Sequence, residues 1–314
     1  MSEAGSADSG FNEQPFDDNL SLRSVDQVFE WSHGRRYHSH SSGSYIYPND
    51  EEEQRRLDLI HEAHLLLHGS LLLSSIDLAG RSILDIGTGT GRWAVDLADQ
   101  NPSVTIVGLD LSPIQPEFVP PNVHFFVENV ETEWSETEEY DFIHLRGMSG
   151  AIKDWQSLFH KIYRALKPGG VVEVHETLPA VFSKTQVLAP ENPLVELMRD
   201  LVHAHTITGR PLDPVLTFRT SAEQAGFADI SEVTFEAPLG DWPDDRQQKD
   251  IGKMLASSFK MGLHGLTSKA FRDVLGRSKA EVEVFNAFVR RELDHNTSEL
   301  MLHIFVFTAQ KTEQ

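Results

Sequence analysis

The segment ILDIGTGTGRWAVDLAD, residues 83–99, constrains the fold more than any other part of the chain. It places Gly87, Gly89 and Gly91 directly after an apolar run and directly before a helical pattern. A strand that passes through a glycine-rich turn into a helix is typical of α/β folds, whose ligands bind at that turn. Glycines let the backbone approach a ligand, and the first helical turn offers it unpaired N–H groups.

Two common glycine-turn signatures do not fit this segment. A dinucleotide fingerprint needs its third glycine five positions after the first, and Arg92 stands there. A phosphate-binding loop of the Walker type needs Gly-Lys-Ser/Thr, which does not follow. The turn therefore predicts a nucleoside-binding loop that serves a different cofactor.

Two carboxylates indicate which cofactor that is. Asp85 lies two residues before Gly87, where it would repel a pyrophosphate but attract an α-ammonium group. Asp110 ends the next apolar run, 23 residues beyond Gly87, where an acid can accept hydrogen bonds from both ribose hydroxyls. The alternative for Asp110 is a helix N-cap, since Ser112 and Pro113 follow. Together the carboxylates predict a nucleoside that carries an amino acid, namely S-adenosylmethionine.

The region around the turn alternates short apolar runs with helix-like segments. Five runs are predicted to be parallel strands buried on both faces: SILDI, VTIVGLD, VHFFV, YDFIHL and GVVEVHE, all between residues 82 and 176. After residue 176 we expect helices at 192–206, 221–227, about 248–260 and 278–293, and strands at 231–239 and 300–311. Ser278 and Glu281 form a capping box at the start of the last helix.

The pattern predicts a single domain at 47–314, divided into a cofactor-binding core at 80–176 and a substrate side at 177–314. Residues 1–46 are rich in Ser, Gly, Asp and His and are expected to form a flexible extension, although 26–37 has the aromatic and basic content to dock on a surface. A helix is expected from Asn49 or Asp50 to Gly69.

Composition excludes several function classes. The chain has no cysteine, so disulfides, thiolate metal sites and cysteine nucleophiles are ruled out. A net charge of −21 opposes contact with a phosphate backbone, so no nucleic acid partner is expected. No apolar stretch approaches the roughly 20 residues that span a bilayer, and no membrane association is predicted.

Three histidines, His61, His64 and His68, fall on one stripe of the first predicted helix. The spacing HEAH is one residue shorter than the zinc motif HExxH, and no acid nearby in sequence offers a further ligand. The sequence therefore favours histidines at the wet margin of a helix lying across the domain edge, and no metal site is predicted.

Several motifs together resemble class I S-adenosylmethionine-dependent methyltransferases, specifically the fungal LaeA-like group: DIGTGTGRWA, GLDLSPIQP, PPNVHFF, DFIHLRG and LKPGGVVEV. The resemblance runs from about residue 36 to 311 and implies a Rossmann-like, seven-stranded, mostly parallel sheet with an antiparallel last strand. It also implies helical insertions after strands 5 and 6 that form the acceptor pocket.

The expected cofactor-binding residues follow the edge of this sheet. Asn129 and Val130 stand where the adenine edge would be recognised; the family most often has an acid at the first position, but an amide oxygen can still accept from the exocyclic amine. Arg146 can orient the methionine carboxylate or an acceptor carboxylate. The full predicted set is Asp85, Gly87, Thr88, Gly89, Gly91, Asp110, Leu111, Asn129, Val130 and Arg146.

Methyl transfer from a sulfonium requires alignment of the acceptor and, for an OH or acidic NH, removal of a proton. His144 is one candidate base at the end of the fourth strand, with a buried histidine bonded to a carbonyl as the alternative. His175 and Glu176, which follow the fifth strand, are the others. Proximity alone can also suffice.

We expect a cytoplasmic enzyme that methylates O or N of a small-molecule secondary metabolite in a fungal pathway. The alternative is a LaeA-like nuclear regulator of secondary metabolism acting through protein partners or protein methylation, and a cofactor that serves only as a scaffold is a third interpretation. Arg35, Arg36 and Tyr37 are predicted to close over the cofactor as an N-terminal lid.

Overall fold

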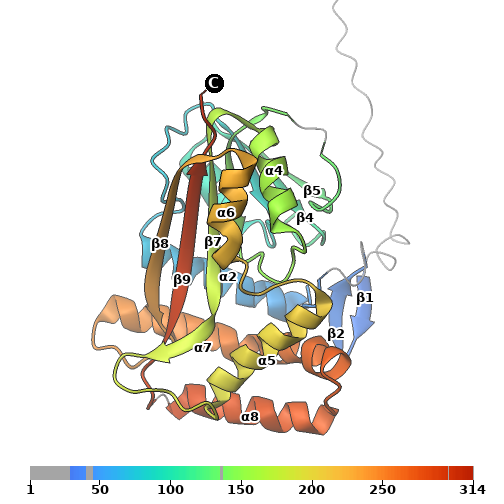
Figure 1. Ribbon diagram of the computed structural model, residues 1–314, viewed down its shortest axis with the longest axis vertical. Helices are drawn as coiled ribbons and strands as arrows, with labels where there is room; N and C mark the ends of the chain where they lie inside the picture. Colours follow the sequence, from blue (N-terminus) through green and yellow to red (C-terminus); the bar gives the residue numbers. More distant parts are fainter. Residues whose placement is uncertain (1–28, 40–44, 135–136, 296, 314) are drawn as a thin grey trace, which may run out of the picture.

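A seven-stranded sheet forms the centre of the protein (Figure 1). The computed structural model describes residues 29–39, 45–134, 137–295 and 297–313. Across the sheet the strand order is β5-β4-β3-β6-β7-β9-β8. Their bounds in chain order are β3 Ser82–Ile86, β4 Thr105–Asp110, β5 Val123–Val127, β6 Tyr140–Arg146, β7 Leu166–Ser183, β8 Ala228–Pro238 and β9 Leu300–Gln310. The last strand, β9, runs antiparallel to both of its neighbours, and the other pairs are parallel.

This topology confirms the predicted α/β class, with a mostly parallel sheet of seven strands and an antiparallel last strand. The expectation that all five parallel strands are buried on both faces is wrong for β5. As the edge strand it has one neighbour, β4, and Phe126 and Val127 remain 47% and 40% exposed. Apolar composition alone does not reveal that a strand lies at an edge.

The helices begin and end where local capping groups stand. Asp50 caps the first long helix by accepting from the backbone N–H of Glu53, and Gly69 ends it in the left-handed conformation. Ser278 and Glu281 form the predicted capping box. The helices are α2 Glu51–His68, α3 Arg92–Gln100, α4 Trp155–Ala165, α5 Pro193–Thr208, α6 Val215–Ala225, α7 Arg246–Thr267, the π-helix η1 Ser268–Val274 and α8 Lys279–His295.

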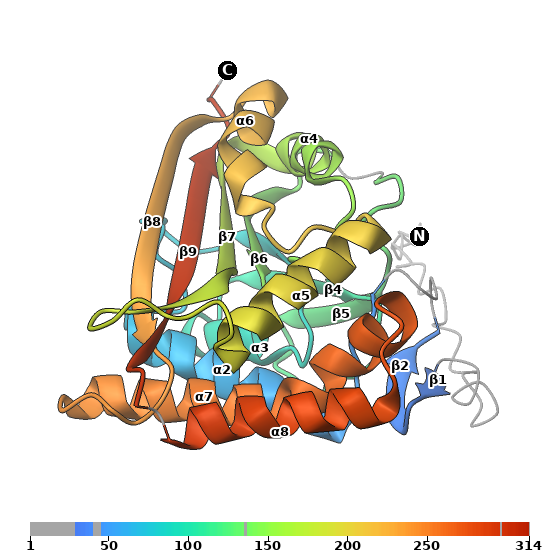
Figure 2. The same cartoon turned by 60° about the horizontal axis from the view of Figure 1, so that its bottom comes forward.

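Helices cover both faces of the sheet. α4 and α6 pack with β6, β7 and β9 on one face, and α3 packs with β3, β4 and β5 on the other. The fifth and sixth strands of the sheet along the chain are β7 and β8. The insertion predicted after the fifth strand consists of α5 and α6, and the one predicted after the sixth consists of α7, η1 and α8. Figure 2 shows α5, α7 and α8 gathered at one end of the sheet. They share a second core with β8 and β9.

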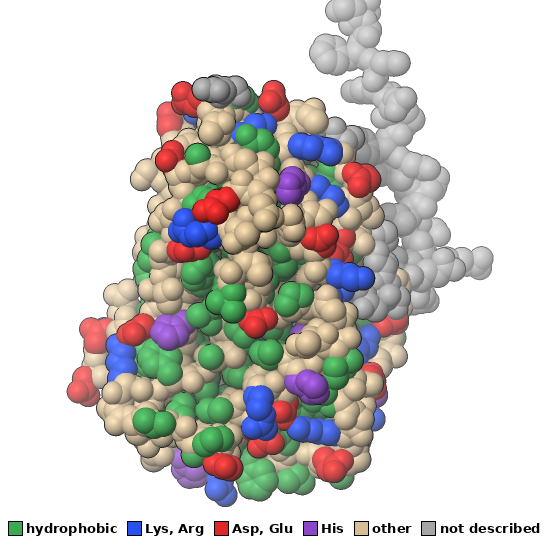
Figure 3. Space-filling view, viewed as in Figure 1, with side chains coloured by type: hydrophobic (Ala, Val, Ile, Leu, Met, Phe, Trp, Pro, Cys, Tyr) green, Lys and Arg blue, Asp and Glu red, His purple; other side chains and the backbone are tan. Residues whose placement is uncertain are grey.

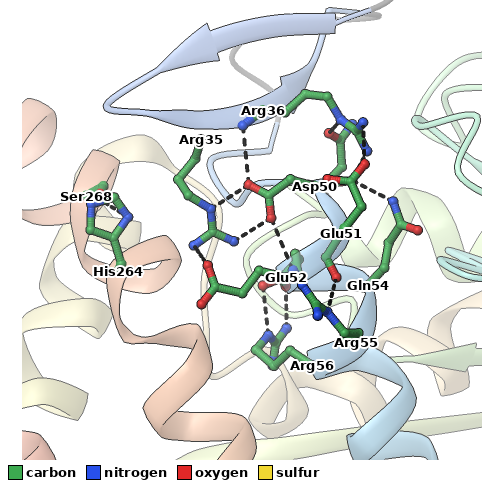
Figure 4. Close-up of polar contacts among 12 residues, drawn as sticks. Arg35, Arg36, Asp50, Glu51, Glu52, Gln54, Arg55, Arg56, His264 and Ser268 are labelled. Atoms are coloured by element: carbon green, nitrogen blue, oxygen red, sulfur yellow. Dashed lines mark hydrogen bonds and ion pairs between the residues drawn. The ribbon is translucent and has the colours of Figure 1, made fainter.

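The N-terminal region contradicts part of the expected flexible extension. Two short strands, β1 Phe29–Ser32 and β2 Arg35–His38, form an antiparallel hairpin, whereas residues 1–28 and 40–44 lie outside the described residues. The side chain of Arg35 donates to the carboxylate of Asp50, with 2.7 Å between Nη2 and Oδ1 (Figure 4). This buried ion pair connects the hairpin to the N-cap of α2, which lies outside the segment.

None of the described helices is long and apolar enough to cross a membrane. On the face drawn in Figure 3, the described Lys and Arg side chains are scattered among Asp and Glu and form no single basic area.

Candidate active site

A cavity of about 320 Å³ lies at the carboxyl ends of β3, β4, β6 and β7. That volume is within the range of about 300–1,000 Å³ typical of small-molecule sites, and this edge of an open α/β sheet is where ligands bind. Every residue that the sequence predicted for cofactor binding or catalysis lines this cavity, with the exception of Gly91.

The three glycines of the turn have different surroundings. A Cβ on Gly87 would lie 2.0 Å from Sδ of Met148, so this glycine admits the Met148 side chain. Gly89 is open, since a Cβ there would meet only Leu57 and the Gly87 carbonyl, at 3.6 Å and 4.0 Å. Gly91 instead contacts the ring of Phe125, at 2.5 Å from its ideal Cβ. Only the first two glycines bring backbone to the cavity; Gly91 packs the start of α3 against the sheet.

The carboxylate of Asp110 is held by the glycine turn. Its Oδ2 accepts from the backbone N–H of Gly89 at 2.8 Å, and its Oδ1 accepts from that of Ser112 at 2.9 Å. Burial raises the pKa of Asp110, although these two hydrogen bonds act in the opposite direction. Asn49, in the segment before α2, donates to the Ser112 hydroxyl at 3.0 Å and so covers this end of the cavity.

Asp85 and His144 form a buried pair. They are register partners on adjacent strands, and Nδ1 of His144 donates to Oδ1 of Asp85 at 2.7 Å. The hydroxyl of Thr88 donates to the other oxygen of Asp85 at 2.6 Å. The Trp93 ring stacks on His144, with ring centroids 3.8 Å apart, and burial lowers the pKa of His144 to about 4. Sequence spacing could not reveal this pair, because strand register creates it.

Arg146 lies at the end of β6 and contacts α2. Its Nη2 donates to Nδ1 of His61 at 3.0 Å, while Nε2 of His61 donates to Asp96 at 2.9 Å. Burial lowers the pKa of both Arg146 and His61. The expectation that the histidines of α2 occupy a wet margin is therefore wrong for His61 and His64, which are buried. The two hydrogen-bond partners of His61 come from other elements of the fold, Arg146 from β6 and Asp96 from α3.

Glu176 lies within β7, which continues to Ser183, so His175 and Glu176 do not follow the strand as expected. Its Oε1 accepts from the backbone N–H groups of Met148 and Ser149, at 2.7 and 3.1 Å. Burial raises the pKa of Glu176 to about 7, against the effect of these hydrogen bonds. The carboxyl group can therefore exchange a proton near neutral pH.

His175 is paired with Glu173, a residue that the sequence analysis missed. Nε2 of His175 donates to Oε1 of Glu173 at 2.7 Å. Burial alone would raise the pKa of Glu173, but hydrogen bonds from His175, Ser74 and the Leu73 backbone lower it to about 2. The sequence signal that could have identified Glu173 is its place inside the apolar run GVVEVHE, because a buried carboxylate needs hydrogen-bond partners.

Leu111, Asn129 and Val130 also line the cavity. The side-chain oxygen of Asn129 accepts from the backbone N–H of Glu131 at 2.9 Å.

The residues that line the cavity do not follow the expected division into a cofactor-binding core at 80–176 and a substrate side at 177–314. Beyond Glu176, the described part of the chain contributes only Thr177, Leu212 and Leu266, whereas the segment from Tyr45 to His64 supplies most of one side. Arg35, Arg36 and Tyr37, the predicted lid, are not among the lining residues.

Comparisons with known proteins identify the family. The family model described as a methyltransferase domain matches residues 45–232. Methyltransferase pytC from Aspergillus terreus is 41% identical over 93% of this chain and 90% of its own length, and the secondary metabolism regulator LAE1 from Cochliobolus heterostrophus is 36% identical over 90% and 94%. The solved cyclopropane synthase MmaA2 from Mycobacterium tuberculosis gives a TM-score of 0.48 at 18% identity, over 83% of this chain and 94% of that one.

The open backbone at Gly89 and the buried carboxylate of Asp110 fit the cofactor of this family, since one admits close approach and the other offers acceptors to hydroxyl groups. The match covers more than half of the chain, and the relative pytC shares 41% identity over most of it. The chain therefore belongs to the methyltransferase domain family and is an S-adenosylmethionine-dependent methyltransferase with the class I fold.

Proposed function

We propose that the protein methylates an oxygen or nitrogen atom of a small secondary metabolite. The observation that carries this proposal is that one cavity is lined both by the glycine turn with Asp110 and by Glu176, a carboxyl group whose pKa is about 7. A small acceptor fits such a cavity, which is walled by α2 and the segment before it. The identity shared with LAE1, which is named a secondary metabolism regulator, supports a place in secondary metabolism, and the identity shared with pytC supports an enzyme.

Each predicted cofactor residue except Gly91 has a role in this proposal. Asp110 accepts from the ribose hydroxyls, and the backbone of Gly87 to Gly89 admits the amino-acid end. Asp85 and Arg146 provide opposite charges for the ammonium and carboxylate groups of that end. Asn129 and Val130 border the adenine, with Leu111 beside them; Thr88 holds Asp85 in position through its hydroxyl.

When bound, S-adenosylmethionine supplies a methyl group on a sulfonium, with a neutral thioether as leaving group. The residues of the chain then have to align the acceptor, exclude water and remove a proton. Of the three candidate bases, Glu176 suits the last task, because His144 is engaged with Asp85 and has its pKa lowered to about 4, and His175 is engaged with Glu173. The backbone N–H groups of Met148 and Ser149 hold its Oε1 in place.

We also propose that residues 29–313 act as one methyltransferase domain that includes the N-terminal hairpin. In it the 80–176 core binds the cofactor, and the acceptor contacts the Tyr45–His64 segment as well as the region after Glu176.

Replacing Asp110 with Ala is expected to weaken cofactor binding by about 1.5–3 kcal/mol, because two hydrogen bonds to a charged acceptor are lost. This corresponds to roughly a 10- to 150-fold rise in Kd, measured by isothermal titration calorimetry. Asp99→Ala, which changes an exposed acid on α3, is the matched control. An unchanged Kd in Asp110→Ala would rule out the assignment of Asp110.

The acceptor class is tested with methyl-labelled S-adenosylmethionine. The purified protein is incubated separately with the low-molecular-mass fraction of a fungal extract, with its protein fraction and with recombinant histones. Asp110→Ala, at a cofactor concentration below its Kd, serves as the control with reduced labelling. Label is expected in small molecules. Label confined to proteins would overturn the proposal and favour the regulatory alternative, as in the relative named a secondary metabolism regulator.

A further inference from the structure

Three histidines from two distant segments meet beside the cavity. His64 and His68 lie one turn apart on α2, and His175 comes from β7. Each offers a ring nitrogen, and these nitrogens all lie within 4.8 Å of one another. We call this group the three-histidine cluster. His64 and His175 also line the cavity, so the cluster adjoins the site of methyl transfer without taking part in the steps assigned above.

Four ring nitrogens of the cluster lack partners among the described residues. Nδ1 of His64, Nδ1 of His175 and both ring nitrogens of His68 are buried without a hydrogen bond. A buried polar atom that remains unpaired costs about 1–3 kcal/mol. Four unpaired nitrogens in one cluster therefore indicate that a ligand binds there. His61 provides the contrast on the same helix, since Arg146 and Asp96 satisfy both of its nitrogens.

Glu173 orients the histidine on the sheet. It accepts from Nε2 of His175 at 2.7 Å, which leaves Nδ1 as the nitrogen with a free lone pair. Backbone N–H groups of Leu73 and Ser74 hold the Glu173 carboxylate in turn, at 2.9 and 2.7 Å. A carboxylate behind a ligating histidine is the arrangement that fixes tautomer and ring orientation at metal sites. On the other side, the Phe235 ring lies edge to face with His68, at 4.5 Å between centroids.

We propose that His64, His68 and His175 bind one divalent transition-metal ion of the Zn²⁺ class. Imidazole nitrogen suits Zn²⁺ and its neighbours, whereas Mg²⁺ and Ca²⁺ prefer oxygen ligands. A tetrahedral ion with bonds of about 2.0–2.1 Å needs its nitrogens about 3.3 Å apart, so the rings have to move inward from the separations seen here. Three protein ligands leave a fourth position for water or another small ligand.

The site escaped the sequence because its third ligand is far away along the chain. The spacing HEAH draws attention to His61 and His64, but the pair that binds is His64 and His68, four residues apart on one helix face. Only the packing of α2 over β7 supplies His175 and its carboxylate.

The test measures metal binding directly on untagged, full-length protein that has been treated with chelator. After incubation with ZnCl₂ and gel filtration, one Zn²⁺ per chain is expected by mass spectrometry of the element, and Co²⁺ should give the visible absorption of a low-coordinate site. His68→Ala, a change at a partly exposed position, should weaken Zn²⁺ binding at least about 100-fold, and Glu173→Gln should weaken it about 10- to 100-fold.

His124→Ala and His203→Ala, which alter exposed histidines elsewhere, are the controls and should bind Zn²⁺ like the wild type. Circular dichroism and cofactor affinity establish that each variant is folded. Zn²⁺ should raise the melting temperature of the wild type but not of His68→Ala. Binding far below one ion per chain in the wild type would overturn the proposal. So would an unchanged Zn²⁺ affinity in a folded His68→Ala variant.

Discussion

Replacing Glu176 with Gln is expected to lower kcat for methyl transfer by about 10²- to 10⁴-fold, the usual contribution of a positioned general base. The amide has the same shape and its oxygen can still accept from the backbone of Met148 and Ser149, so the loop that follows β6 should keep its position. The carboxylate that takes the acceptor proton is lost. Initial rates of label transfer to the acceptor fraction, at saturating cofactor, measure the effect.

Two further measurements separate a missing base from a damaged site. Cofactor Kd should be nearly unchanged in Glu176→Gln, and Glu139→Gln, an exposed acid, should retain wild-type kcat. A wild-type kcat in Glu176→Gln would show that proximity alone drives transfer or that another group removes the proton.

Replacing Asp50 with Asn is expected to lower the free energy of unfolding by about 3–5 kcal/mol, the cost of leaving one charge of a buried ion pair without its partner. The side chains of Arg35 and Asp50 are only 7% and 12% exposed. Figure 4 shows Arg35 reaching from β2 to this carboxylate, where Glu52 is a second, weaker partner at 3.4 Å. Asparagine is also a good N-cap, so α2 keeps its capping group. Urea unfolding at pH 7 measures the loss.

The pH dependence of this loss has a definite sign. Burial by itself would raise the pKa of Asp50, but hydrogen bonding from Arg35 brings it below the ordinary 3.8. A carboxyl with a lowered folded-state pKa stabilises the protein above its unfolded-state pKa, and this contribution disappears as pH falls through the folded-state value. The difference between wild type and Asp50→Asn should therefore be full at pH 7 and narrow below pH 3.8.

Glu51→Gln is the matched control for this pair. Glu51 binds Arg36 through a side chain that is 73% exposed, and exposed ion pairs contribute about 0–1 kcal/mol. If Asp50→Asn cost no more than Glu51→Gln, the hairpin would not depend on the Arg35–Asp50 pair.

The sequence predicted the sheet well because strands and helix ends carry local signals. The run 82–86 is β3 residue for residue, and the helix expected near Arg92 begins there as α3. The N-cap Asp50 and the Ser278–Glu281 capping box were found from residue type and spacing alone. In both caps the groups that interact lie within four residues of one another, so the sequence contains the whole interaction.

The errors arose where the partner lies far along the chain. The sequence indicated that 26–37 can dock on a surface but not where, because its ion-pair partner, Asp50, stands beyond the segment. Gly91 matched a ligand-binding pattern, but the ring of Phe125 from another strand occupies the space beside it. Exposure of β5 depends on its place at the edge of the sheet.

By itself the sequence determined the α/β class, the order of the elements and the position of the glycine turn that lines the cavity with Asp110, because periodicity, capping and glycine content act over a few residues. Only the tertiary structure decided which polar side chains contact one another. Strand register pairs Asp85 with His144, and packing of α2 over β7 brings His64 and His68 to His175. These contacts join residues separated by 59 positions or more. They form only when the packing of the helices and strands has fixed which face of each element is buried.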